Sequence, residues 1–161
     1  GVPLPDNSGC VQGANAGKLA VTLDLGHPDA RPVLEALVRW ADVVTESFGP
    51  RRMRALGLHY ETLRQVNARL LMLSTCLMGQ TGPRATFAGY GNLAAAISGF
   101  SNLGGWPDRA PAGPFSAYTD YVSPRFIALA ILAALEHRRQ TGAGQYIDCS
   151  HAASSSRHFR C

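Results

Sequence analysis

Asp120 is the residue of this sequence best placed to carry chemistry. It follows residues 104–114, a long loop rich in glycine and proline, and it precedes Ser123-Pro124, which predicts the start of a helix. A carboxylate outside that helix is not needed as its N-cap and is free for another role. The alternative is a turn aspartate whose side chain hydrogen-bonds its own backbone. Position alone leaves both interpretations open.

The other reactive side chains form no recognisable catalytic set. The glycine-rich residues 13–18 and 79–83 match neither of the common nucleotide-binding motifs. The arginine cluster at 51, 52 and 54 could hold phosphate groups, because guanidinium pairs bidentately with phosphate, or it could be ordinary solvated surface. No Ser/His/Asp or Cys/His arrangement follows from the spacing of the histidines, which are His27, His59, His137, His151 and His158.

The cysteines predict no metal site, and nothing in the sequence predicts a membrane anchor. Cys10, Cys76, Cys149 and Cys161 lie far apart without the spacing of zinc ligands, so we interpret them as free thiols of a reducing compartment. The longest apolar run, residues 126–135, is about half as long as a membrane-spanning helix. With no basic and apolar leader, the expectation is a cytoplasmic protein. The sequence opens without Met, so we expect its true start to lie upstream.

The composition is that of one folded domain with a weak preference for anionic ligands. The chain has 161 residues, of which 46% are hydrophobic and 16% charged, unlike a disordered chain. Its net charge of +4 suits a phosphate ester, but the basic residues are spread along the sequence and predict no nucleic-acid surface.

Alternating apolar segments predict an α/β fold. Residues 18–25 (KLAVTLDL) are typical of a strand, 33–41 of a helix with Asp29 as N-cap, and 42–46 of a second strand. Such a strand–helix–strand unit is expected to be parallel and right-handed. Residues 1–17 are interpreted as loop. Further helices are expected at 50–56, 60–67 and 92–100, with a strand at 69–75.

The last third of the sequence predicts a buried helix, a strand and a tail. Residues 125–140 form the helix, which is apolar on every face over 126–135 and ends at Gly142 after Arg138 and Arg139. A strand follows at 145–149. From His151 the periodicity is lost, so residues 151–161 are interpreted as an atypical tail outside the fold.

Several stretches, in one order along residues 13–150, resemble the class III CoA-transferase family, also called the carnitine and bile-acid CoA-transferase group. The resemblance implies a partial Rossmann-like domain over residues 1–150, incomplete at both ends. Relatives are much longer, and complete members form interlocked homodimers. The stretches are NAGK at 15–18, VTLDL at 21–25, ADVV at 41–44, ESFGP at 46–50, GLHYETL at 57–63, GQTGP at 79–83, TDY at 119–121, AALEHR at 133–138 and TGAGQ at 141–145.

In that family the aspartate at the position of Asp120 is the nucleophile. By resemblance it attacks an acyl-CoA thioester to give a mixed anhydride, and CoA thiolate then returns to form an aspartyl-CoA thioester that a second carboxylic acid resolves. Coenzyme A and acyl-CoA are thus substrates, and no tightly bound cofactor is expected. The CoA nucleotide is expected at Ser47, Phe48 and Leu56, with Arg54 near its phosphates. Many relatives have Asn at position 47 and Arg at position 55.

Two alternatives stay open. The family contains α-methylacyl-CoA racemases, which use a His and an Asp as paired acid and base, but the position of that His is occupied by Tyr90, a poor base at neutral pH. The transferase is therefore favoured over the racemase. The other alternative is a non-catalytic remnant of a longer enzyme.

Overall fold

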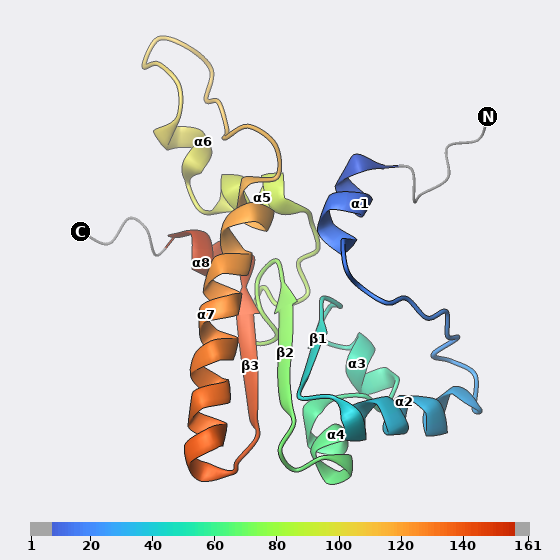
Figure 1. Ribbon diagram of the computed structural model, residues 1–161. Coiled ribbons are helices and arrows are strands. Elements are labelled where there is room, and N and C mark those ends of the chain that lie inside the picture. The colour runs from blue at the N-terminus through green and yellow to red at the C-terminus, as the bar shows by residue number, and fades with distance from the viewer. Residues whose placement is uncertain (1–7, 157–161) are drawn as a thin grey trace, which may run out of the picture.

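The structure, a computed structural model, describes residues 8–156 and is built on a three-stranded parallel sheet (Figure 1). Its strands are β1 (Val43–Glu46), β2 (Leu71–Cys76) and β3 (Gln145–Ser150), in the order β1-β2-β3. Leu71 of β2 lies opposite Val43 on one side and Gln145 on the other. This architecture confirms the expected α/β class and three of the predicted strands.

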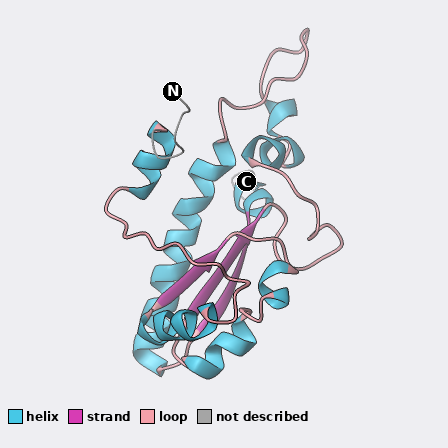
Figure 2. Cartoon of the chain, turned by 90° about the vertical axis from the view of Figure 1, so that its right-hand side faces the viewer, coloured by secondary structure: helices cyan, strands magenta, loops and turns pink. Residues whose placement is uncertain are grey.

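The central strand is covered on both faces. Leu71–Ser74 are buried, as expected for an apolar run in the middle of a parallel sheet. Met72 packs with Val38 of α2 (Ala30–Trp40) and Leu63 of α4 (Tyr60–Val66) in the main core cluster. The long helix α7 (Tyr118–Thr141) contacts β2 and β3 and runs behind the strands in Figure 2, with α2 in front of them. The short α3 (Arg52–Ala55) and α4 occupy the positions predicted for them.

Helix α7 begins earlier in the chain than the sequence predicts. It starts at Tyr118, so Ser123 is fully buried inside it and Pro124 lies within the helix. The prediction of Ser123 as N-cap is therefore wrong. The C-terminal end is confirmed: Arg138 and Arg139 lie in the last turn, and Gly142 ends the helix with a φ of 78°.

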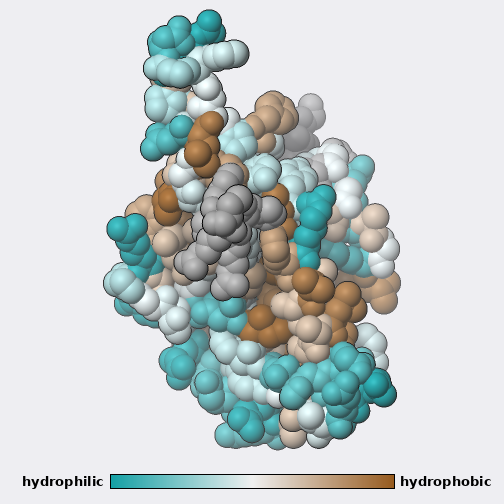
Figure 3. Space-filling model, turned by 90° about the vertical axis from the view of Figure 1, so that its left-hand side faces the viewer, coloured by the Kyte–Doolittle hydropathy of each residue, from teal (hydrophilic) through white to brown (hydrophobic). Residues whose placement is uncertain are grey.

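The expectation that α7 is buried on every face is also wrong. Leu129 and Leu132 are 65% and 63% exposed, and the side of the molecule that carries α7 shows apolar surface (Figure 3). One face of the helix contacts the sheet, and among the described residues nothing covers these two leucines. At its C-terminal end the helix is held to the sheet by Arg138. The Arg138 guanidinium pairs with the Asp42 carboxylate at 2.8 Å and donates to the backbone carbonyls of Asp42 and Arg69, each at 3.1 Å.

The N-terminal segment differs most from its prediction. Residues 18–25 form no strand and pair with no other strand in the described part of the chain, so the predicted strand–helix–strand unit at 18–46 is absent. Leu19 and Val21 are 101% and 72% exposed, which shows that no neighbour supplies the burial a strand would need. Asp29 stands at the N-cap position of α2 but makes no capping side-chain bond. Residues predicted as loop form α1 (Gly9–Asn15), and residues 1–7 lie outside the described part.

The segment after β3 continues the fold, contrary to the predicted boundary at residue 150. His151–Ser156 form α8, which contacts α7 and α5 (Gly91–Ile97), and Ala152 is 7% exposed. Ser98 Oγ donates to the Ala152 carbonyl at 3.1 Å. Only residues 157–161 of the predicted tail lie outside the described structure. Gly99, with φ 90°, separates α5 from α6 (Phe100–Leu103), and residues 104–114 form the predicted loop.

Candidate functional site

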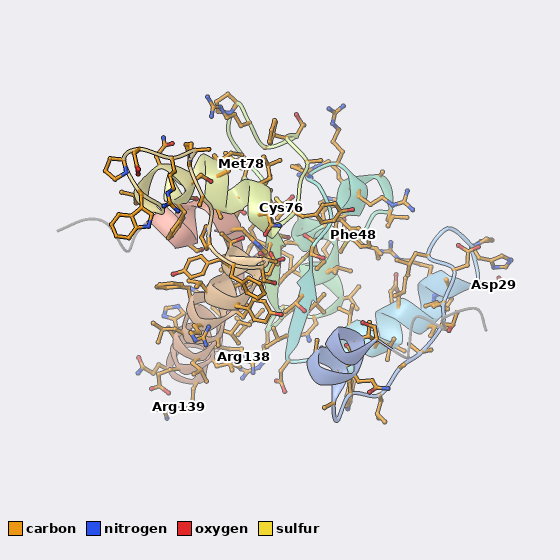
Figure 4. All side chains as sticks on the ribbon, turned by 90° about the horizontal axis from the view of Figure 1, so that it is seen from above. Asp29, Phe48, Cys76, Met78, Arg138 and Arg139 are labelled. Carbon is orange, nitrogen blue, oxygen red and sulfur yellow. The ribbon has the colours of Figure 1, made fainter. Side chains whose placement is uncertain are left out.

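Asp120 lines a cavity of about 340 Å³ at the carboxyl end of the sheet. It lies in the first turn of α7, not in a free loop before the helix as the sequence predicted. The cavity wall includes Ser47 after β1, Cys76 at the end of β2 and His151 after β3. The carboxyl ends of parallel strands meet at one edge of a sheet, where α/β proteins commonly bind ligands. Figure 4 looks down on this edge, with Phe48, Cys76 and Met78 labelled.

A buried hydrogen bond fixes the turn that carries Asp120. Thr119, which is fully buried, donates its hydroxyl to the Gly91 carbonyl at 3.0 Å and so joins the start of α7 to the start of α5. The Asp120 amide donates to the Ala117 carbonyl at 2.9 Å. Because Pro124 has no N–H, it cannot donate the usual helical bond to the Asp120 carbonyl. The bonds made by the Thr119 hydroxyl and the Asp120 amide hold this turn, while Pro124 leaves the Asp120 carbonyl without its usual helical donor.

The Asp120 carboxylate lies directly over Gly91. A Cβ added to Gly91 would stand 2.7 Å from Cγ and Oδ2 of Asp120 and 2.8 Å from Oδ1, closer than real Cβ contacts come. Only a residue without a side chain at position 91 leaves the carboxylate in this place.

His151 is a site residue that sequence reasoning missed. Its Nδ1 lies 3.3 Å from Asp120 Oδ1, and both residues line the same cavity. The His151 side chain is 21% exposed, compared with 46% for Asp120. The two residues belong to different helices, and the histidine stands in the stretch that the sequence predicts as a tail. No short-range signal in the sequence links them.

The residues predicted for CoA binding are only partly brought to this cavity. Ser47 lines it, and Phe48 next to it is 43% exposed with its backbone held by Glu46 Oε2 and by Gln80 Nε2. Arg54 instead lines a second cavity, of about 520 Å³. Leu56 lines neither; its partly buried side chain packs against the core cluster. Their roles toward CoA remain predictions.

Several polar side chains also lie together at the strand ends, next to the loop at residues 79–83. The backbone N–H of Gln80 donates to both carboxylate oxygens of Asp148, each at 2.9 Å. Burial, aided by the charges of Asp148 and Glu46, raises the pKa of the Cys76 thiol. Burial also raises the pKa of Tyr146, whose ring stacks on Tyr60. Cys76 therefore lines the cavity as a protonated, weakly reactive thiol.

The described residues contain no group of three or more His, Cys, Asp or Glu side chains that could hold a metal ion. Cys76 and Cys149 are free thiols, while the side chain of Cys10 and all of Cys161 lie outside the described structure. None of the described helices is long and apolar enough to span a bilayer.

The sequence profile of CoA-transferase family III matches residues 2–160, almost the entire chain. The chain belongs to this family. The match includes residues 151–156, in agreement with the packing of α8 and against the predicted boundary at residue 150.

Two relatives of known activity and one solved structure illustrate the similarity. The chain is 39% identical over 145 residues to the beta subunit of succinyl-CoA–L-malate CoA-transferase from Chloroflexus aurantiacus, covering 89% of this chain and 35% of that protein. It is 40% identical over 134 residues to succinate–glutarate CoA-transferase from Agrobacterium fabrum, covering 83% and 34%. A CaiB/BaiF family protein from Brucella suis superposes with a TM-score of 0.85 at 35% identity, covering 89% of this chain and 38% of that one.

The chain thus spans about a third of the length of these relatives. The resemblance to class III CoA-transferases inferred from the sequence motifs is confirmed. The fold agrees as well, since the solved relative contains the same arrangement over the matched residues.

Proposed function

We propose that this chain carries the nucleophile and part of the CoA site of a CoA-transferase. In this proposal Asp120 accepts the acyl group of an acyl-CoA, then CoA itself as an aspartyl-CoA thioester, and a second carboxylic acid takes the CoA away. The observation that carries the proposal is the place of Asp120: a half-exposed carboxylate, on a turn fixed by a buried hydrogen bond, facing a cavity at the carboxyl end of a parallel sheet.

The cavity suits this chemistry because it can shelter a reactive acyl group. A mixed anhydride survives only where water is kept away from it, and a concave site does this better than open surface. Ser47 lies on the same cavity wall, which supports a CoA molecule entering past the loop after β1. The adjoining Phe48 ring is exposed and free to pack on an adenine ring.

Small dicarboxylic acids are the substrate class that the relatives support. The proteins from Chloroflexus aurantiacus and Agrobacterium fabrum are named for succinate or succinyl-CoA together with malate or glutarate. We propose succinyl-CoA as the first donor to test, with a homodimer as the working assembly. Neither coenzyme A nor acyl-CoA is proposed as a resident cofactor; both are substrates.

The geometry argues against a racemase. Racemisation needs an acid and a base on opposite sides of the substrate carbon, but His151 and Asp120 are in direct contact and leave no room for a carbon between them. Tyr90, at the position where the racemases carry their histidine, lines the cavity and is 90% exposed.

The test is covalent trapping on the purified chain. Incubation with succinyl-CoA followed by hydroxylamine should leave a hydroxamate on Asp120, detected by peptide mass spectrometry, because hydroxylamine intercepts activated carboxyl groups. Asp120→Asn keeps size and packing but removes the ionised oxygen, so trapping and CoA transfer should fall by at least ~10³-fold. If the Asn variant keeps more than about a tenth of the activity, a barrier change below ~1.4 kcal/mol, Asp120 is a turn residue and the mechanism is wrong.

A chain that shows neither a hydroxamate nor a rise in melting temperature with CoA would support the alternative of a non-catalytic chain over the transferase.

A further inference from the structure

We propose that His151 is a positioning residue for Asp120: its Nδ1–H donates to Oδ1 of the carboxylate and holds it in the orientation for attack. The inference rests on the proposed function and adds a residue to it. The contact is the 3.3 Å separation of Nδ1 and Oδ1, inside the cavity that both residues line.

The backbone around His151 is fixed on both sides, so its imidazole is delivered to a defined place. Before it, Ser150 pairs with Cys76 at the end of β2 and donates its hydroxyl to the Leu77 carbonyl at 3.1 Å. After it, the Ala152 amide donates to the same carbonyl at 3.1 Å. Because the backbone on both sides of His151 is already ordered, little further conformational entropy is lost when its side chain holds the carboxylate.

The carboxylate itself needs such a partner. It is 46% exposed and rests on Gly91, which offers it space but no side-chain contact. A carboxylate on a flexible side chain spends most of its time outside the attack geometry, and fixing one oxygen raises the fraction of reactive orientations. Among the described residues that line this cavity, His151 supplies an ionisable group in contact with that carboxylate.

The chemistry leaves His151 with a positioning role and no proton transfer. The free carboxylate oxygen bonds to the thioester carbonyl carbon, the C–S bond breaks, and CoA departs as thiolate carrying the negative charge that the carboxylate brought. The thiolate then bonds to the Asp120 carbonyl carbon and the acyl group departs as a carboxylate. Charge and protons balance at each step without an acid or a base, so the imidazole keeps its Nδ1 proton throughout.

Two substitutions separate this role from a structural one. In His151→Asn the side-chain amide nitrogen stands two bonds from Cβ, as Nδ1 does, so it preserves the donor; His151→Ala removes it. Rates of Asp120 hydroxamate formation with succinyl-CoA are measured over a range of donor concentrations. The Ala variant should lose about tenfold in the maximal rate with little change in half-saturation, and the Asn variant should stay within about threefold of the wild type.

His27→Ala is the matched control. Nδ1 of His27 also lies near an aspartate, 3.8 Å from Oδ2 of Asp29, but both side chains are exposed and neither lines the cavity of Asp120. This control should leave the rate unchanged. Circular dichroism confirms that each variant folds. If His151→Ala reacts as fast as the wild type, or if His151→Asn is as slow as His151→Ala, the proposal is overturned.

A second readout does not depend on activity. The imidazole nitrogen chemical shifts of His151, measured by NMR at one pH, should change when Asp120→Asn replaces the acceptor, while those of His27 stay the same. Unchanged His151 shifts overturn the contact whatever the activity. Changed shifts in a chain whose Asp120 forms no hydroxamate uphold the contact and refute the proposed function alone.

Discussion

Replacing Gly91 by Ala should slow the reaction of Asp120 while leaving the fold as stable as before, or more so. The new Cβ would stand 2.7 Å from the Asp120 carboxylate, which must retreat by about 0.7 Å to reach the 3.4 Å at which ordinary contact begins. Misplacing a reacting group by about 1 Å can cost ~10²-fold in rate, so we expect a loss of about 10-fold to 100-fold. Gly91 is the first residue of α5 and has no positive φ, and Ala in a helix is favoured over Gly by up to ~1 kcal/mol.

The assay pairs hydroxamate formation on Asp120 with thermal unfolding. Asn92→Ala is the control, since it introduces the same residue one position later. The Asn92 side chain is exposed and does not line the cavity. A Gly91→Ala variant that reacts as fast as the wild type would refute the claim that the missing side chain keeps the carboxylate in place. A variant that is slow but strongly destabilised would show that the substitution damages the fold.

Two further predictions concern stability and thiol reactivity. Arg138→Gln should lower the free energy of unfolding by about 1–3 kcal/mol in urea titrations, because its side chain is 11% exposed and bonds to Asp42 and to the Arg69 carbonyl. Arg139→Gln, at a side chain that is 72% exposed, should leave the free energy of unfolding essentially unchanged. Equal effects of the two substitutions would contradict this account. Because burial raises the pKa of Cys76, a smaller fraction of this thiol is ionised near pH ~8 than in free cysteine. Iodoacetamide should therefore alkylate Cys76 more slowly than free cysteine, as followed by mass spectrometry, and an equal rate would count against this account.

Elements with a strong local pattern were predictable from the sequence. The apolar run of β2 and the spaced apolar residues of α2 carry their own signal. The structure places the ends of β2 within two residues, and those of α2 within three residues, of the prediction. Gly142 likewise marks the end of α7, because its positive φ is a local requirement. The proposal that Asp120 is a site residue came from the order of family motifs, while its place in a cavity came from the structure.

The errors all involve information that lies outside the local sequence. Residues 18–25 have the composition of a strand, but a strand needs a partner, and the described chain offers none. Ser123-Pro124 is a common helix start, yet the helix gains a further turn because buried Thr119 bonds to Gly91 in a distant segment. His151 could not be linked to Asp120, because α8 is brought to α7 only when β3 joins the sheet.

The order of the strands has a consequence for how the protein is made. Within residues 8–156, β3 pairs with β2 alone. Gln145 must find Leu71 across the loops and helices that separate them, and closing so long a stretch of chain has a high entropic cost. During synthesis, β1 and β2 can pair while α7 is still being translated, but the edge that brings His151 to Asp120 is completed only after β3 emerges. Asp120 and His151 are therefore brought together only after β3 has emerged, and shorter nascent chains carry Asp120 without this neighbour.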